Sequence, residues 1–170
     1  KTSDITLKNI LFGEVWLCSG QSNMTLPLKG NIGQPVFGSN EAIANSSNPN
    51  LRLFTVDRVG AKTPLKEVEK YIAWQQASPE SAADFSAIGY FFGQQLQEIL
   101  DVPVGIIHSS WGGSLIEAWM SREVLSGYQK INIEDANLEK ANRVQTALFN
   151  AMIHPLIPYT IKGVLWYQGE

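Results

Sequence analysis

Cysteine, histidine and long apolar runs are all scarce in this sequence of 170 residues. Its single cysteine, Cys18, excludes an internal disulfide and lies within an apolar run, where a thiol is usually buried and inert. Clusters of cysteine and histidine with the spacing of a zinc module are missing, and no other metal or organic cofactor is indicated. No stretch approaches the roughly 18 apolar residues that cross a bilayer, so we expect no membrane partner.

An excess of charge of one sign is also missing. The 13 Lys and Arg residues and 16 Asp and Glu residues give a net charge of −3 with both histidines neutral. Without a basic run, charge-driven binding to nucleic acid or to an anionic membrane is not expected. Residues 1–4 are polar and no apolar segment follows them, so no signal peptide is predicted. The length and the 44% hydrophobic composition fit one folded domain.

Short apolar runs rich in β-branched and aromatic residues predict the strands. Apolar residues on one helical face predict helices over residues 85–99 and 138–151, and Ser81 with Asp84 resembles a capping box at the start of the first. Residues 30–50 are rich in Gly, Asn, Ser and Pro and predict a long loop. The predicted strands are residues 14–19, 51–56, 104–108 and 161–167.

This alternation of helices and buried strands predicts an α/β fold with a mostly parallel sheet covered on both faces. Three of the strands run into polar loops that carry glycine beside serine or glutamine, at residues 20–23, 109–114 and 168–170. The carboxyl ends of parallel strands gather at one edge of a sheet, where ligands bind. We therefore expect these three loops to form one site.

Ser22 follows the first strand and Gly20, the kind of sharp turn on which many hydrolases place a nucleophile. A serine becomes a nucleophile only when a base takes its proton and the oxyanion product is stabilised. The alternative is that Ser22 caps the turn that follows it. Gly112 and Gly113 either let a backbone N–H approach such an oxyanion closely or form a tight turn that needs positive φ.

Gln168 and Glu170 follow the last strand. A glutamine amide can donate to an oxyanion, and a glutamate can orient a histidine or bind a sugar hydroxyl, although both are common on surface loops. His108 and His154 are the two candidates for a histidine base, and each also suits a structural role. Neither has an aspartate two or three residues away, so the base lies outside this chain if neither serves.

Three ordered motifs resemble those of the sialate O-acetylesterase family, which are carbohydrate acetylesterases of the SGNH (GDSL) hydrolase superfamily. Their sequences are VWLCSGQSNM at residues 15–24, IHSSWGGSLIEAW at 107–119 and VLWYQGE at 164–170. The resemblance implies a three-layer α/β/α sandwich with a mostly parallel, flavodoxin-like sheet, which this chain carries incompletely. It also implies that the substrate is an acetylated sugar.

The resemblance further implies a role for each residue of the site. Ser22 is the expected nucleophile, and Glu170 is a weaker candidate for the acid partner of the base. The expected oxyanion donors are the backbone N–H of Ser22, the backbone N–H of Gly113 (with Gly112 as second choice) and the side chain of Gln168. The expected substrate contacts are Gln21, Asn23 and Trp111, of which the tryptophan suits a sugar ring or core packing.

One part of the family pattern is missing from the sequence. The histidine base of the family and its aspartate lie in an Asp-x-x-His motif well downstream of the third motif, and the chain stops first. We therefore expect residues 1–170 to form the amino-terminal portion of an SGNH hydrolase catalytic domain, completed by a downstream segment or a second chain. By analogy with the family, its expected location is secreted, periplasmic or lysosomal.

Three functions stay open at this point. The leading one is a serine-dependent O-acetylesterase that removes acetyl groups from sugar hydroxyls, with O-acetylated sialic acid as substrate and an acyl-enzyme at Ser22. Acetylated xylan is the alternative substrate within the same superfamily. The alternative of a different class is a non-catalytic carbohydrate-binding fragment that keeps the cleft.

Overall fold

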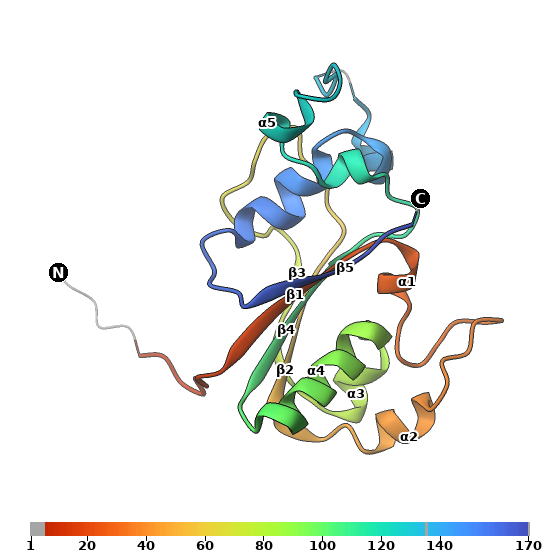
Figure 1. The fold of residues 1–170 in the computed structure, drawn as a ribbon, viewed down its shortest axis with the longest axis vertical. Coiled ribbons are helices and arrows are strands. Elements are labelled where there is room, and N and C mark those ends of the chain that lie inside the picture. Colours follow the sequence, from red (N-terminus) through yellow and green to blue (C-terminus); the bar gives the residue numbers. More distant parts are fainter. Residues whose placement is uncertain (1–5, 135, 170) are drawn as a thin grey trace.

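A computed structural model describes residues 6–134 and 136–169 (Figure 1). Five strands form one sheet in the order β3-β2-β4-β1-β5. All neighbouring strands are parallel except the pair β2 and β3, which is antiparallel. The expected α/β fold with a mostly parallel sheet is confirmed. The strands are β1 (Glu14–Gly20), β2 (Asn48–Val56), β3 (Tyr71–Ala77), β4 (Val104–Ser110) and β5 (Gly163–Tyr167).

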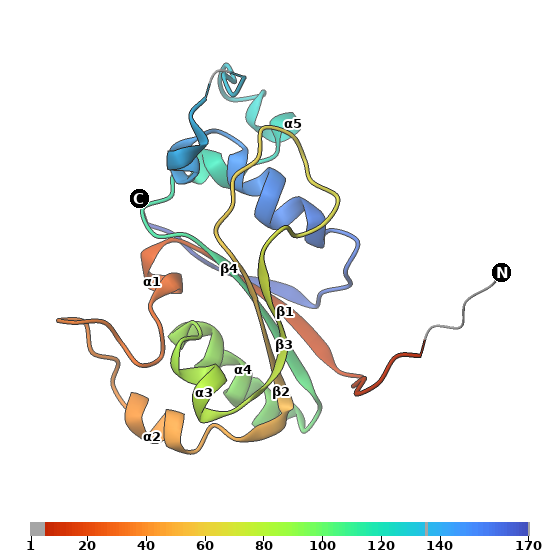
Figure 2. The ribbon, with the colours of Figure 1, turned by 180° about the vertical axis from the view of Figure 1, so that it is seen from behind.

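Helices cover both faces of the sheet, as two opposite views show (Figures 1 and 2), which confirms the expected three layers. Each layer packs its own apolar cluster against the sheet. None of the described helices is long and apolar enough to cross a membrane. One layer holds α1 (Ser22–Thr25), α2 (Ser39–Ala44), α3 (Pro79–Ala83) and α4 (Ala87–Leu100). The other holds α5 (Arg122–Leu125) and the short 3-10 and π turns η1 (Ile116–Trp119), η2 (Leu138–Arg143), η3 (Phe149–Ile153) and η4 (His154–Leu156).

β4 lies in the middle of the sheet, and all seven of its residues are buried. Its first four residues, VGII, form the apolar run that a strand covered on both faces requires, and His108, Ser109 and Ser110 are buried polar residues at its carboxyl end. The strand register places Gly20, at the end of β1, opposite Ser110 of β4 and Tyr167 of β5. The carboxyl ends of these three strands therefore meet at one edge of the sheet, beside α1 (Figure 1).

The predicted start of the long helix is wrong. Ser86 caps α4, because its Oγ accepts a hydrogen bond of 3.1 Å from the N–H of Gly89. Ser81 instead forms a capping box with Ser78 at the start of α3, and Asp84 is the residue that ends α3. A short extra helix therefore occupies the turn that the sequence pattern assigned to the start of α4.

The predicted helix over residues 138–151 is not continuous. Lys140 has non-helical backbone angles inside η2, and Thr146 has a φ of +62° between η2 and η3. The apolar positions of the pattern still face the core, since Ala141, Leu148 and Ala151 are buried. The spacing therefore identified the buried residues of this segment correctly, whereas its backbone follows two separate turns.

The sequence pattern also missed two elements. The predicted loop over residues 30–50 contains α2 and the first residues of β2. β3 pairs with β2 as an antiparallel edge strand, and six of its seven residues are exposed. An edge strand that is exposed on both faces lacks the alternation by which a half-buried strand is recognised.

Candidate active site at the carboxyl edge of the sheet

Ser22 stands at the sharp turn between β1 and α1. Gly20 ends β1 with a φ of +132°, and the next N–H, that of Gln21, donates a hydrogen bond of 3.0 Å to the carbonyl of Tyr167. Ser22 is the first residue of α1, so its own N–H has no acceptor within the helix. Its side chain is exposed. The turn therefore presents a hydroxyl and a backbone donor together at the edge of the sheet.

The loop after β4 packs directly against Ser22. The N–H of Trp111 donates to the carbonyl of Gly20 over 3.1 Å, which ties this loop to the end of β1. A Cβ atom built on Gly112 would lie 3.7 Å from Cα of Ser22. Gly112 is therefore the residue that faces the serine across the site.

Asn142 holds the two glycines of this loop from the other side. Its Nδ2 donates to the carbonyl oxygens of Gly112 and Gly113, over 3.2 Å in each case. A trans peptide carries its C=O and N–H in opposite directions, so the N–H of Gly113 points away from Asn142. Within residues 6–134 and 136–169, no oxygen accepts a hydrogen bond from that N–H. The loop thus keeps one backbone donor available.

Gln168 reaches the same loop from the end of β5. Its Nε2 donates to the carbonyl of Ser114 over 2.8 Å. The hydroxyl of Ser114 accepts from the indole nitrogen of Trp119, also at 2.8 Å, and this ring packs edge-on against Trp166 of β5. The structure therefore brings together the loops of Ser22, of the paired glycines and of Gln168, although they are far apart in the sequence.

A cavity of about 630 Å³ opens beside Ser22. Its lining includes Asn23 and Gly112, together with the charged residues Arg58 and Asp84. A second cavity of about 400 Å³ adjoins it, because Arg58, Asp84 and Thr25 line both. The serine therefore lies at one end of a hollow whose other end is lined by His108 and Ser110.

Two of the other predicted site residues, Gln21 and Trp111, line neither of these cavities. Gln21 is buried and does not line the cavity beside Ser22. Trp111 is half-buried and packs against the apolar cluster beneath η1 to η3. Glu170 lies outside the described residues. Burial raises the pKa of Cys18 to about 12, as expected for an inert thiol.

Sequence reasoning missed Arg58, Asn142 and Thr25. Arg58 follows the carboxyl end of β2, which is parallel to β4, so strand direction alone could have placed it at this edge. Asn142 lies in η2, where no pattern in the sequence points to the loop that it holds.

Within the described segments, no three side chains of the metal-binding types are grouped so as to hold an ion.

His108 is the buried end of a chain of hydrogen bonds that leads to the turn before Ser22. Its Nε2 lies 2.6 Å from Oγ of Ser110, which lies 2.9 Å from Oγ1 of Thr25. The Thr25 hydroxyl donates over 3.0 Å to the carbonyl of Gln21. Since each hydroxyl has one proton, Ser110 donates to Thr25, and His108 donates from Nε2 to Ser110.

Neither histidine is placed as the base of Ser22 in this structure. Burial and, to a lesser extent, the charge of Arg58 lower the pKa of His108 to about 4, although a hydrogen bond with the backbone of Met24 acts in the opposite direction. His108 is thus a neutral donor to Ser110 at pH 7. His154 bonds through Nδ1 to the carbonyl of Leu65, at 2.8 Å. The described residues therefore supply a candidate nucleophile without its base.

We predict that His108 makes the free energy of unfolding fall as the pH falls below neutrality. Its pKa is about 4 in the folded state against roughly 6.5 in the unfolded chain, so the unfolded chain binds the proton more readily. The stability that comes from keeping His108 neutral in the fold is complete above roughly pH 6.5 and is lost as the pH falls towards 4. Urea unfolding should show the wild type losing ~2–3 kcal/mol more than His108→Gln between pH 7 and pH 4.5. Identical losses in the two proteins would show that His108 does not titrate in this way.

Comparisons with known proteins give one consistent family. A family model described as carbohydrate esterase, sialic acid-specific acetylesterase matches residues 12–170. The human sialate O-acetylesterase is 35% identical over 175 residues, which cover 98% of this chain and 32% of that protein. The mouse sialate O-acetylesterase is 33% identical over 205 residues, covering 99% of this chain and 37% of that protein.

A solved structure agrees with these sequence matches. The crystal structure of a carbohydrate acetylesterase from Xanthomonas citri matches with a TM-score of 0.80 and 39% sequence identity, covering 93% of this chain and 33% of that one. The chain therefore spans about a third of the length of the relatives that it matches.

Proposed function

Because the chain belongs to the sialic acid-specific acetylesterase family of carbohydrate esterases, we propose that it carries the nucleophile and oxyanion donors of a serine-dependent carbohydrate O-acetylesterase. The observation that carries the proposal is the close approach of Gly112 to Ser22 beside an open cavity. An exposed serine on a sharp turn, with backbone donors packed around it, is the arrangement that acyl transfer requires, and a surface loop without a catalytic role does not need it.

The proposed reaction has two steps. Oγ of Ser22 attacks the carbonyl carbon of the acetyl ester and loses its proton, and the electron pair of the C=O bond moves to oxygen. When the pair returns, the bond to the sugar oxygen breaks, and that oxygen takes a proton and leaves. Water then attacks the acetyl-serine in the same way, which releases acetate and restores the hydroxyl.

The oxyanion formed in each step needs donors that are in place before the reaction. We assign this role to the N–H of Ser22, the N–H of Gly113 and Nε2 of Gln168, with Gly112 as the alternative backbone donor. The N–H of Ser22 has no acceptor within α1, and the N–H of Gly113 points away from Asn142, as described above. Gln168 is held by its bond to Ser114, which fixes its amide at the edge of the glycine loop.

A base must take the proton of Ser22, and neither described histidine bonds to this serine. We propose that the base and its aspartate come from an Asp-x-x-His motif in a downstream segment or second chain. Glu170 stays a candidate for the acid partner. Residues 1–170 would then be the amino-terminal portion of the catalytic domain, consistent with their share of the relatives' length.

We propose O-acetylated sialic acid as the substrate, because the family and the curated relatives carry that specificity in their names. The test compares acetate release from O-acetylated sialic acid and from acetylated xylan, using the protein that contains this chain. We expect kcat/KM to be at least about tenfold higher for the sialic acid, a difference of about 1.4 kcal/mol in transition-state binding. The reverse preference would establish a xylan esterase, and binding without turnover would establish a carbohydrate-binding fragment.

Replacing Gln168 with methionine, which keeps the length of the side chain, should lower kcat on an aryl acetate. Loss of one oxyanion donor costs about 10²–10³-fold in kcat, with little effect on KM. The matched control is Gln145→Met, because Gln145 accepts from the N–H of Asn132 away from the site. Equal kcat values for the Gln168 variant and the wild type would remove Gln168 from the oxyanion site.

A further inference from the structure

Arg58 occupies the junction of the two adjoining cavities. It lines the cavity that contains Ser22 and Gly112 and also the cavity that contains His108 and Ser110. Its side chain is exposed, and its charge is close enough to His108 to lower the pKa of that buried ring. A positive charge therefore faces the space beside the proposed nucleophile.

The backbone around Arg58 is fixed on both sides. On one side it follows β2, which pairs with the central strand β4. On the other side Gly60 packs so tightly against Ala141 that a Cβ atom on the glycine would lie 2.2 Å from the Cβ of the alanine. The N–H of Ala61 then donates to the carbonyl of Ala147 over 3.1 Å.

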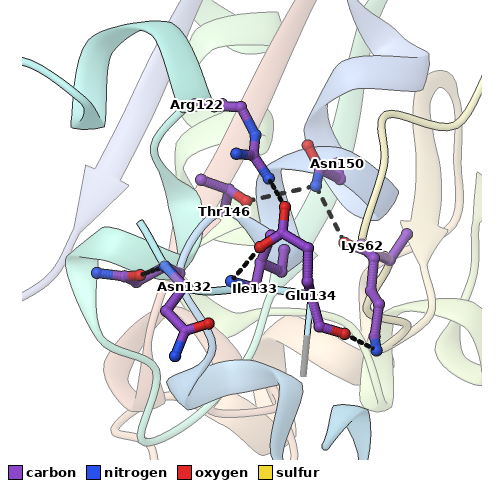
Figure 3. A network of polar contacts seen from close by, with 9 residues as sticks. Lys62, Arg122, Asn132, Ile133, Glu134, Thr146 and Asn150 are labelled. Carbon is purple, nitrogen blue, oxygen red and sulfur yellow. Dashed lines mark hydrogen bonds and ion pairs between the residues drawn. The ribbon is translucent and has the colours of Figure 1, made fainter. Parts of the chain in front are cut away.

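Polar contacts also tie residues 61 and 62, which follow Arg58, to the layer that holds α5 and the η turns (Figure 3). Nδ2 of Asn150 donates to the carbonyl of Ala61 over 3.0 Å, and Nζ of Lys62 donates to the carbonyl of Glu134. The carboxylate of Glu134 in turn pairs with Arg122 at 3.1 Å. Arg58 therefore projects from a segment held by the body of the fold, which is what a residue that orients a ligand requires.

The guanidinium of Arg58 has no carboxylate partner within the described parts of the chain, although acidic residues face the same space. Asp84 lines both cavities, but it pairs with Lys29. The carboxylate of Asp57 accepts the backbone N–H of Arg58, and that of Glu80 accepts the hydroxyl of Ser78. The donors of Arg58 are therefore available to an anionic group on a ligand.

We propose that Arg58 binds the carboxylate of an acidic sugar whose acetyl ester lies at Ser22. The inference rests on the proposed acetylesterase function and deepens it. A guanidinium presents two parallel N–H donors that match the two oxygens of a carboxylate, so this contact fixes orientation as well as charge. Neutral sugars such as the xylose units of xylan lack the carboxylate. Arg58 is thus a specificity-determining residue for acidic over neutral substrates.

The test measures kcat/KM for O-acetylated sialic acid and for its methyl ester, in which an uncharged ester with one added methyl group replaces the carboxylate. We expect the wild type to prefer the free acid about tenfold or more, and Arg58→Gln to bring this ratio close to one. Arg58→Lys should keep part of the preference, because it retains charge without the planar fork. Arg52→Gln, which removes a guanidinium bonded to Asn9 and to the carbonyl of Pro49 and lining neither cavity, is the matched control and should leave the ratio unchanged.

A wild-type ratio near one, or the same ratio in wild type and Arg58→Gln, would overturn the role of Arg58. Equal losses on both substrates would do the same, since they indicate a structural defect. If the wild type releases no acetate from these sugars or from an aryl acetate, the proposed function fails instead. Titration with unacetylated sialic acid then decides the role of Arg58: a Kd about tenfold weaker in Arg58→Gln supports it, and an equal Kd overturns it.

Discussion

Replacing Ser22 with alanine is expected to abolish acetate release, with a fall in kcat of at least about 10³-fold. The alanine has no oxygen to form the acetyl intermediate, whereas the oxyanion donors and the cavity remain. Residual turnover should reflect those groups alone, with water as the attacking nucleophile. The measurement is acetate release from an aryl acetate by the protein that contains this chain.

The fold should tolerate this substitution. The Ser22 side chain is exposed, and the α1 hydrogen bond of this residue is made by its backbone carbonyl, which accepts from Leu26. The free energy of unfolding should therefore stay within about 0.5 kcal/mol of the wild type. Ser126→Ala, another exposed serine, is the matched control and should retain full activity. Retained activity in Ser22→Ala would rule out Ser22 as the nucleophile.

Replacing Gly20 with alanine is expected to have the largest effect on stability. The φ of Gly20 is +132°, a conformation that is strained for any residue with a side chain. The added Cβ would lie 2.2 Å from the carbonyl oxygen of Tyr167, in the backbone of the neighbouring strand. That backbone cannot yield without breaking the pairing of β1 and β5. We expect a loss of about 3 kcal/mol or more in the free energy of unfolding.

Gly112→Ala provides the matched control for this prediction. A Cβ on Gly112 would lie 3.7 Å from Cα of Ser22, which is an ordinary contact, and its φ is not in the positive range. Its free energy of unfolding should change by less than about 1 kcal/mol. Urea unfolding of the two variants distinguishes them. Equal stability of Gly20→Ala and wild type would contradict the close approach of β1 and β5 at the site.

The sequence predicts the strands that build the site because burial on both faces imposes a continuous apolar run. β1 and β4 contain such runs, whereas β5 is an apolar run at the edge of the sheet with three of its five residues exposed, and each strand ends in a polar loop. Parallel strand direction then places Ser22, Gly112 and Gln168 at one edge without any knowledge of loop structure. Contacts between the loops bear this out, most directly the bond between Gln168 and the carbonyl of Ser114.

The remaining features depend on contacts that no local pattern encodes. Asn142 supports the glycine loop from 29 to 30 residues away in the sequence, through hydrogen bonds to main-chain carbonyls. The positive φ of Thr146 interrupts a helical pattern whose apolar spacing is sound. The segment that follows Arg58 is held by the packing of Gly60 on Ala141 of η2, a contact between residues far apart in the sequence. In each case tertiary packing decides the conformation.

Covalent labelling distinguishes an activated nucleophile at Ser22 from an ordinary surface serine. A fluorophosphonate reacts with a serine whose proton is removed and whose oxyanion is stabilised, and mass spectrometry of the digested protein identifies the modified peptide. We expect one phosphonyl group on the peptide that contains Ser22 and no label in Ser22→Ala. Label on a different residue, or acetate release by a protein that takes up no label at Ser22, would contradict this expectation.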